Sequence, residues 1–378
     1  MDRVRSLVNR SNHSSSSRSR NNHNQQTQTG SHEGLNFTDT DQNTVFGDDA
    51  ATLHTTVSET STLGDLRRNG YINRCPNFTW ERNMPFVTTV LGKGVFCFPS
   101  EESFSRFRAN KRRLDVLDND EGLGIPLLHA ISMGMLRSIL NKHLPIMKFY
   151  RYVLTKEGEP APMPLKEGSC ELISRNESRV LYKIELCEVY KRVNSKTGHV
   201  THKFVFRQGD GPNTIFSAIM ANHVFRRDTD ARVGDLNLRW HGTTGLASPF
   251  GSGNFKLLVL DDGMPSLLDQ HTDESYDDAR RRAQPLRLVQ QLPVWATYSD
   301  ETATIIPSKR TLRQANFLIG ETSEQSLGLN NVPWDTVVLT CMCMTLHDFE
   351  SRKDKRTANG RGIGIGSFAP SIAGMPIN

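Results

Sequence analysis

Residues 334–349 read WDTVVLTCMCMTLHDF, and this stretch decides the fold. From Val337 to Leu346 it is apolar except for its threonines. If these residues form a helix, apolar side chains point in every direction, and a helix that is apolar all round must be buried all round. The run is also much shorter than the roughly 20 residues that cross a bilayer. We therefore expect a helix that the rest of the protein encloses.

A buried strand is the competing interpretation of the same residues. Val337, Val338 and the threonines favour a strand, because β-branched side chains fit a pleated sheet. Pro333 and Asp335, however, suit the first turn of a helix. A helix C-terminus, where cations interact favourably with the helix dipole, suits the basic residues Arg352, Lys353, Lys355 and Arg356. These end signals favour the helix over residues 334–349.

The residues that precede this helix predict strands. Between residues 146 and 320 the hydrophobic period is two, and clusters of Gly, Pro, Asn and Asp separate the apolar runs. With a hairpin turn at 194–198 and a polar solvent loop at 265–285, the expected strands are 147–154, 179–190, 202–207, 214–221, 254–260, 294–298, 302–306 and 311–319. Strands without interleaved helices predict a mainly β fold, either an antiparallel barrel or a sandwich.

The segments before residue 146 are less regular. Residues 126–142 have apolar side chains at spacings of three and four after Pro126, which predicts an amphipathic helix packed on the domain. Residues 71–125 contain isolated aromatic anchors and the basic run 106–113, RFRANKRR. We interpret 71–125 as a partly ordered linker, with a docking or nuclear-import motif as the alternative. The predicted barrel domain is thus 126–357, followed by a flexible tail at 358–378.

The first 70 residues predict a disordered Ser/Arg/Asn-rich tail. Hydrophobic residues are sparse there, so burial cannot offset the entropy of ordering the chain. Arg3 lies three residues before Ser6, a spacing that basophilic kinases recognise, so we expect a phosphoprotein with a protein kinase as a partner. No apolar segment follows Met1, and the six cysteines are too few for a disulfide scaffold. We expect a cytoplasmic protein, with peripheral membrane or nuclear location as alternatives.

The order of elements resembles the tubby-like fold, in which a closed β-barrel surrounds a central hydrophobic helix near the end of the chain. The resemblance covers residues 146–357 and rests on the strands and on the helix 334–349. The turn Trp240-His241-Gly242 after residues 235–239 is also similar to the middle of such barrels. The fold group includes tubby proteins, LURP-one-related proteins and phospholipid scramblases. Membership implies an antiparallel β-barrel around a buried C-terminal helix.

Two motifs with potential chemistry have simpler structural explanations. Cys341 and Cys343 could begin a metal site, but helix positions two apart diverge by about 200° and no further ligand has suitable spacing. We interpret both as small buried hydrophobes. The glycine-rich stretch 242–253 could cradle a phosphate, but it lacks the lysine of a P-loop and precedes a strand. A loop between strands is the favoured interpretation, and we predict neither a cofactor nor a metal.

An enzyme is the least favoured class. His241 could act as a general base with Asp261 and Asp262, provided that all three converge in one pocket. Acids followed by glycine, as at Asp210 and Asp262, are also what β-turns require. No nucleophile elbow or catalytic triad is present in the sequence. We therefore predict no catalytic residues.

Basic residues at strand ends are the predicted binding site. Arginine and lysine bind phosphate groups well, and tubby proteins bind phosphoinositide headgroups through basic side chains. The resemblance therefore implies an anionic phospholipid as a partner, whereas an ordinary solvated basic face is the alternative. The predicted lipid-binding or phosphate-binding residues are Lys309, Arg310, Arg313, Arg226 and Arg227.

Two functions follow from these features of the sequence. The first is a non-catalytic adaptor or regulatory protein whose tubby-like domain binds anionic phospholipid. The second is a protein-interaction module that docks signalling or transcription partners through its tail, without lipid. The five arginines of residues 1–32 are too few and too spread out to predict a specific nucleic-acid partner.

Overall fold

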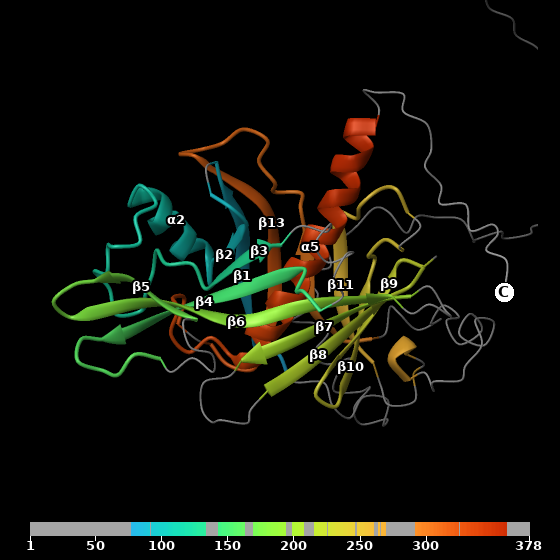
Figure 1. Cartoon of the computed structure of the whole chain (residues 1–378), viewed down its shortest axis with the longest axis horizontal. Coiled ribbons are helices and arrows are strands. Elements are labelled where there is room, and N and C mark those ends of the chain that lie inside the picture. The colour runs from blue at the N-terminus through green and yellow to red at the C-terminus, as the bar shows by residue number, and fades with distance from the viewer. Residues whose placement is uncertain are drawn as a thin grey trace, which may run out of the picture. The chain divides into compact units, whose positions relative to one another are not determined.

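The protein folds as a strand barrel with a helix inside it (Figure 1). This computed structural model describes residues 77–360 except for positions 91, 134–142, 163–168, 194–198, 208–214, 225, 246–247, 261–263, 265, 270–291 and 325. The predicted tail 1–70, the hairpin turn 194–198, and Asp210, Asp261 and Asp262 lie outside these residues. Among the described residues, no helix combines the length and apolar composition needed to span a membrane.

The described strands form one antiparallel ring. Twelve of the 13 strands pair in the order β4-β3-β2-β1-β13-β12-β11-β10-β9-β8-β7-β6, and β6 pairs back onto β4 to close the barrel. The remaining strand, β5, pairs with the first part of β6. The bounds are β1 Trp80–Thr89, β2 Val95–Cys97, β3 Leu128–Ser132, β4 Met147–Lys156, β5 Cys170–Arg175, β6 Arg179–Val193, β7 Val200–Arg207, β8 Ile215–Asn222, β9 Asp228–Val233, β10 Leu236–His241, β11 Asn254–Val259, β12 Val294–Ser299 and β13 Thr311–Glu321.

The C-terminal helix α5, Trp334–Gly360, runs through the inside of the ring. No side chain from Val337 to Leu346 is more than 2 % exposed. Its residues meet strands on separate arcs of the barrel: Thr340 Oγ1 lies 3.5 Å from Met84 Sδ on β1, and Tyr298 Oη on β12 lies 2.7 Å from His347 Nδ1. On the other side Trp334 packs edge-on against Phe206 of β7. The barrel around a buried helix is thus confirmed.

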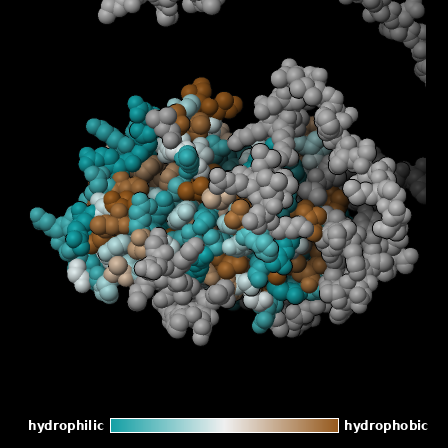
Figure 2. All heavy atoms as spheres, viewed as in Figure 1, coloured by the Kyte–Doolittle hydropathy of each residue, from teal (hydrophilic) through white to brown (hydrophobic). Residues whose placement is uncertain are grey.

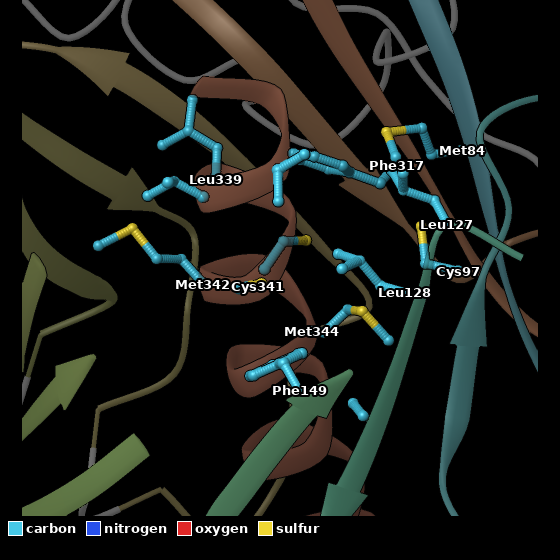
Figure 3. Close-up of a cluster of buried hydrophobic side chains, with 14 of the residues drawn as sticks. Met84, Cys97, Leu127, Leu128, Phe149, Phe317, Leu339, Cys341, Met342 and Met344 are labelled. Carbon is cyan, nitrogen blue, oxygen red and sulfur yellow. The ribbon is translucent and has the colours of Figure 1, made fainter. Parts of the chain in front are cut away.

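The threonines that favoured a strand are accommodated inside this helix. Thr340 Oγ1 donates to Thr336 O at 2.6 Å, and Thr345 Oγ1 donates to Cys341 O at 2.9 Å. Each hydroxyl is therefore satisfied by the carbonyl one turn earlier, which removes the cost of burying it. Figure 3 shows Met344 of α5 extending toward Leu128 of β3, whereas Leu339 and Met342 extend from the opposite side of the helix. All of them belong to one core cluster with side chains of the surrounding strands.

Polar contacts fix both ends of the buried part of α5. At its start, Thr336 Oγ1 donates to Glu321 Oε1 at 2.8 Å, and Glu321 is paired with the buried Arg82. Near residue 350, Glu350 accepts the backbone N–H of Thr244 at 3.1 Å and that of Ser252 at 3.0 Å. These bonds set the depth at which the helix lies in the barrel.

The predicted linker 71–125 is wrong over its described part, because it supplies β1, β2 and a helix. β1 pairs with β13 over its whole length, so the barrel begins at Trp80 rather than at residue 126. The helix α2, Glu101–Ala109, starts at Ser100, whose side chain accepts the Ser103 N–H. It packs Phe104 and Phe107 against Val87 and Phe98 on the outside of the barrel. Long-range strand pairing, which the local sequence does not reveal, orders this segment.

Three further predictions differ from the structure. Residues 128–132 of the predicted helix 126–142 form β3, which pairs with β2 and β4, and 134–142 lie outside the described residues. The spacing of Leu128 and Ile131 fits a helix, but pairing with the two neighbouring strands makes this segment a strand. Residues 302–306, predicted as a strand, form an exposed loop. Helix α5 extends to Gly360, three residues into the predicted flexible tail 358–378.

Of the predicted loop 265–285, only positions 266–269 are described. There a short 3-10 helix, Leu267–Asp269, buries Leu267. The loop is therefore not wholly solvent-exposed.

Candidate functional site

Six connections between strands lie at one rim of the barrel. The register places the end of β1, the start of β13, the end of β8 and the start of β9 at this same rim. The part of α5 around Glu350 reaches this rim too, because its partners Thr244 and Ser252 lie in the connection between β10 and β11. All five predicted lipid-binding residues are at this rim.

The connection from β12 to β13, residues 300–310, projects from the rim. β13 pairs with β12 only from Asn316 onward, so residues 311–315 extend past the end of β12. The loop folds back along this extension, where Thr304 N donates to Arg313 O at 2.9 Å. Every residue from 301 to 310 is exposed. Figure 1 draws this loop in orange beyond the end of β13, on the same side as α2.

Lys309 and Arg310 form the tight turn that ends this loop. Ser308 and Thr311 bond each other through both backbone pairs, at 3.0 and 2.9 Å, and close a two-residue turn. The φ angles of Lys309 and Arg310 are 49° and 59°. A turn with two positive φ angles normally takes Asn-Gly, because other side chains are strained there. Lys309 and Arg310 therefore occupy two positions where the backbone conformation favours Asn and Gly.

The end of α2 joins this turn. Arg108 Nη2 donates to Ser308 Oγ at 2.7 Å, and the Arg108 guanidinium lies over the Phe104 ring at 5.5 Å. Lys111 and Arg112 follow directly after α2, with φ angles of 53° and 65°. Of the five non-glycine residues with positive φ in the described structure, four are thus cations in these two segments.

The turn between β1 and β2 completes the site. Val90 N donates to Arg310 O at 3.0 Å, so the β1–β2 connection that contains Lys93 starts at the Lys309–Arg310 turn. His129 Nε2 lies 2.7 Å from Lys93 O, and its ring stacks on Phe96 at 4.2 Å. Burial lowers the pKa of His129 to about 4, so the ring is neutral at pH 7 and its Nε2 proton donates to the carbonyl.

We call the cations of these three segments the rim patch, which comprises Lys93, Arg108, Lys111, Arg112, Lys309 and Arg310. Among the described residues, no carboxylate lies within ion-pair distance of any of them. Two nearby acids pair with other cations: Asp115 pairs with Arg113, and Glu101 pairs with Arg313. The rim patch therefore carries uncompensated positive charge suited to an anionic partner.

Arg313 is at the edge of the rim patch but has a different role. Its guanidinium pairs with Glu101 of α2 and lies over the Phe104 ring at 5.6 Å. It is only partly exposed, so it attaches α2 to β13 rather than offering a free charge.

The predicted Arg226 and Arg227 lie at the same rim but on another arc. They connect β8 to β9, and β10, β11 and β12 separate β9 from β13. At a strand spacing of about 4.8 Å, four steps around the ring amount to roughly 19 Å. Burial lowers the pKa of Arg226, whereas Arg227 is exposed. The two predicted basic groups therefore do not form one cluster.

Sequence reasoning missed the contribution of α2 to the site. The sequence shows that the run 106–113 is basic, but its interpretation as part of a linker keeps it out of the predicted site. The usable signal was Ser100 followed by Glu101 and Glu102, which is typical of a helix N-terminus.

The glycine-rich stretch 242–253 is a loop between β10 and β11, as predicted. The N–H groups of Thr244 and Ser252 donate to Glu350, so the protein's own carboxylate takes these donors. Lys353 Nζ also donates to Gly245 O at 3.1 Å. This loop attaches the helix to the barrel.

Cys341 and Cys343 are fully buried, and burial raises the pKa of both thiols well above the usual value. This agrees with their interpretation as small buried hydrophobes. His241 Nδ1 lies 2.8 Å from Asp228 Oδ1 at the rim. β11, the strand that precedes Asp261 and Asp262 in the sequence, ends at the opposite end of the barrel from His241. Within the described part of the chain, no three His, Cys, Asp or Glu side chains gather as a metal site would require.

Comparison with known proteins identifies relatives but no solved structure. The sequence model of the family described as DIA1 matches residues 79–355. The uncharacterised protein YNL165W of Saccharomyces cerevisiae is 43 % identical over 393 aligned positions, which cover 94 % of this chain and 95 % of the yeast protein. Protein DIA1 of the same yeast is 29 % identical, covering 75 % of this chain and 83 % of the relative. No solved structure matches the chain.

Proposed function

The chain belongs to the DIA1 family, and we propose that its barrel is a non-catalytic module that binds anionic phospholipid through the rim patch. The observation that carries the proposal is the set of six cations without an acidic partner in the described structure. A phosphate-bearing surface supplies the missing negative charge. We also propose that the barrel is tubby-like. An experimental structure whose strand order matches a tubby protein around the helix would support this, and a different order would contradict it.

The backbone of the patch supports the proposal independently of charge. Four of its cations hold positive φ angles, a strain of roughly 1–2 kcal/mol for each residue. Such strain persists when a functional constraint selects the residue against its backbone preference. Packing gives no such reason for Lys111, Lys309 and Arg310, because their side chains are exposed.

Liposome co-sedimentation of the full chain tests this function. We expect recovery with phosphatidylcholine vesicles that contain phosphatidylserine or a phosphoinositide, and little recovery with phosphatidylcholine alone. The variants Lys309→Asn with Arg310→Gly, and Lys111→Ala with Arg112→Ala, should each weaken binding. Equal recovery with neutral and anionic vesicles would overturn the proposal.

Two controls make the test specific. Lys156→Ala with Lys203→Ala removes two exposed lysines outside the rim patch and should leave binding unchanged. Arg226→Ala with Arg227→Ala removes the second basic group of the rim. If this variant loses as much binding as the Lys309 and Arg310 variant, the site is wider than the rim patch.

A further inference from the structure

The loop that carries Lys309 and Arg310 also exposes two adjacent isoleucines. Ile305 is 95 % exposed and Ile306 is 80 % exposed, which makes them the most exposed large hydrophobic side chains among the described residues. Single exposed apolar residues are ordinary on protein surfaces. Two adjacent isoleucines that make almost no contact with their own protein are not, and such groups mark surfaces with a partner.

The loop is built so that it presents these side chains outward. Thr304 is held by the bond from its N–H to Arg313 O, and Ser308 is held by its two backbone bonds to Thr311. Ile305, Ile306 and Pro307 therefore lie between two fixed points. Because the backbone is already ordered on either side, little entropy remains to be lost when a partner covers the isoleucines.

Two cations follow the isoleucines in the same loop. Lys309 and Arg310 follow within five residues, and Val90, itself 49 % exposed, lies against Arg310. Figure 2 shows hydrophobic atoms projecting at the upper edge beside a strongly hydrophilic area, where Figure 1 places this loop and α2. An apolar tip with a basic collar matches the layers of an anionic bilayer, with acyl chains below a negatively charged headgroup region.

We propose that Ile305 and Ile306 insert into the acyl boundary of an anionic membrane while the rim patch binds its headgroups. This inference rests on the proposed function and deepens it, because it makes a bilayer rather than a free phosphate compound the partner. Insertion buries two apolar side chains, and the rim patch fixes the orientation of the barrel on the surface. A protein partner would instead cover the isoleucines with its own surface, and this contact would not require lipid acyl chains.

Fluorescence quenching by brominated lipid chains tests insertion directly. The full chain with Ile306→Trp is mixed with vesicles of brominated phosphatidylcholine, with and without phosphatidylserine. We expect quenching above that of the native tryptophans only when phosphatidylserine is present. Leu172→Trp on β5, which replaces another exposed apolar residue outside the rim patch, is the matched control and should show no additional quenching.

The binding assay separates insertion from the proposed function. Ile305→Ser with Ile306→Ser should lower affinity for phosphatidylserine vesicles by about tenfold or more, since the gain from burying both side chains is lost. Binding of Ile306→Trp to anionic vesicles without additional quenching would overturn insertion but leave the proposed function standing. Failure of the unaltered chain to bind any vesicle would overturn both, and would point to a protein partner.

Discussion

Arg108 Nη2 donates a hydrogen bond to Ser308 Oγ at 2.7 Å, and so joins two segments that lie 200 residues apart in the chain. Arg108 belongs to the end of α2, and Ser308 precedes the Lys309–Arg310 turn. The sequence predicted a binding site at Lys309 and Arg310, but it placed the basic residues of the first segment in a linker. Together they place five of the six rim-patch cations on one side of the barrel, and the turn before β2 adds the sixth.

Replacing Lys309 and Arg310 by Asn and Gly should change stability and lipid binding in opposite directions. Asn-Gly suits two positive φ angles, so the free energy of unfolding should rise by about 1 kcal/mol. Affinity for anionic vesicles should fall roughly 30-fold, since each cation near such a surface contributes about 1 kcal/mol. Urea denaturation and co-sedimentation measure the two effects. A variant that is both more stable and equally well bound would show that these cations have no lipid role.

Salt should weaken membrane binding only in part. Raising NaCl from about 0.1 to about 0.5 M shortens the screening length from about 10 Å toward the roughly 3 Å that applies at about 1 M. This weakens the attraction between the rim patch and the headgroups. The contribution of Ile305 and Ile306 does not depend on charge. Co-sedimentation at both salt concentrations should therefore leave residual binding that the double serine variant lacks. Identical salt curves for the two proteins would contradict this expectation.

The Arg82–Glu321 pair should be important for stability, because both side chains are buried and the distance from Arg82 Nε to Glu321 Oε1 is 2.8 Å. Glu321→Leu leaves the guanidinium without its charge partner and should lower the free energy of unfolding by about 3–5 kcal/mol. Combining it with Arg82→Met should recover much of this loss. Asp115→Asn, which removes the charge of the solvent-exposed pair with Arg113, should have little effect on stability. Equal effects of Glu321→Leu and Asp115→Asn in urea denaturation would argue against burial of the first pair.

Truncation inside the barrel should be costly, whereas truncation in the projecting loop should not. Leu339→Ala and Met342→Ala each leave a cavity around α5 and should lower the free energy of unfolding by about 2–5 kcal/mol. Ile305→Ala removes a side chain that is almost fully exposed and should have an effect within about 0.5 kcal/mol. Chemical denaturation measures all three. A small effect at Leu339 and Met342 would place the helix on an outer surface.

Acid should destabilise the protein through His202. Burial, with a smaller contribution from Lys191, lowers its pKa to about 4, while the unfolded chain has a value near 6.5. The unfolded state thus binds more protons between these values, so stability is fully present above about pH 6.5 and falls as the pH drops toward 4. His202→Phe, which keeps a ring against Phe349, should reduce the loss in urea midpoint between about pH 7 and about pH 5. An unchanged pH dependence would show that His202 does not titrate in this way.

The sequence alone determined the strand periodicity and the burial of the apolar part of α5, residues 337–346. The reason is that a run such as Val337–Leu346 has no polar side to expose, so its environment follows from its composition. β6, β7 and β13 were also visible, because their apolar residues alternate along a single strand.

Only the tertiary structure decided the beginning of the barrel and the composition of the rim patch. β1 is a strand because β13, from the far end of the chain, lies beside it, and β3 is a strand because β2 and β4 lie on either side of it. Likewise, the basic run of α2 reaches the Lys309–Arg310 turn only because Phe104 and Phe107 pack against β1 and the segment after β2. Local patterns predict which side chains are buried, whereas ring closure and packing determine which surfaces meet.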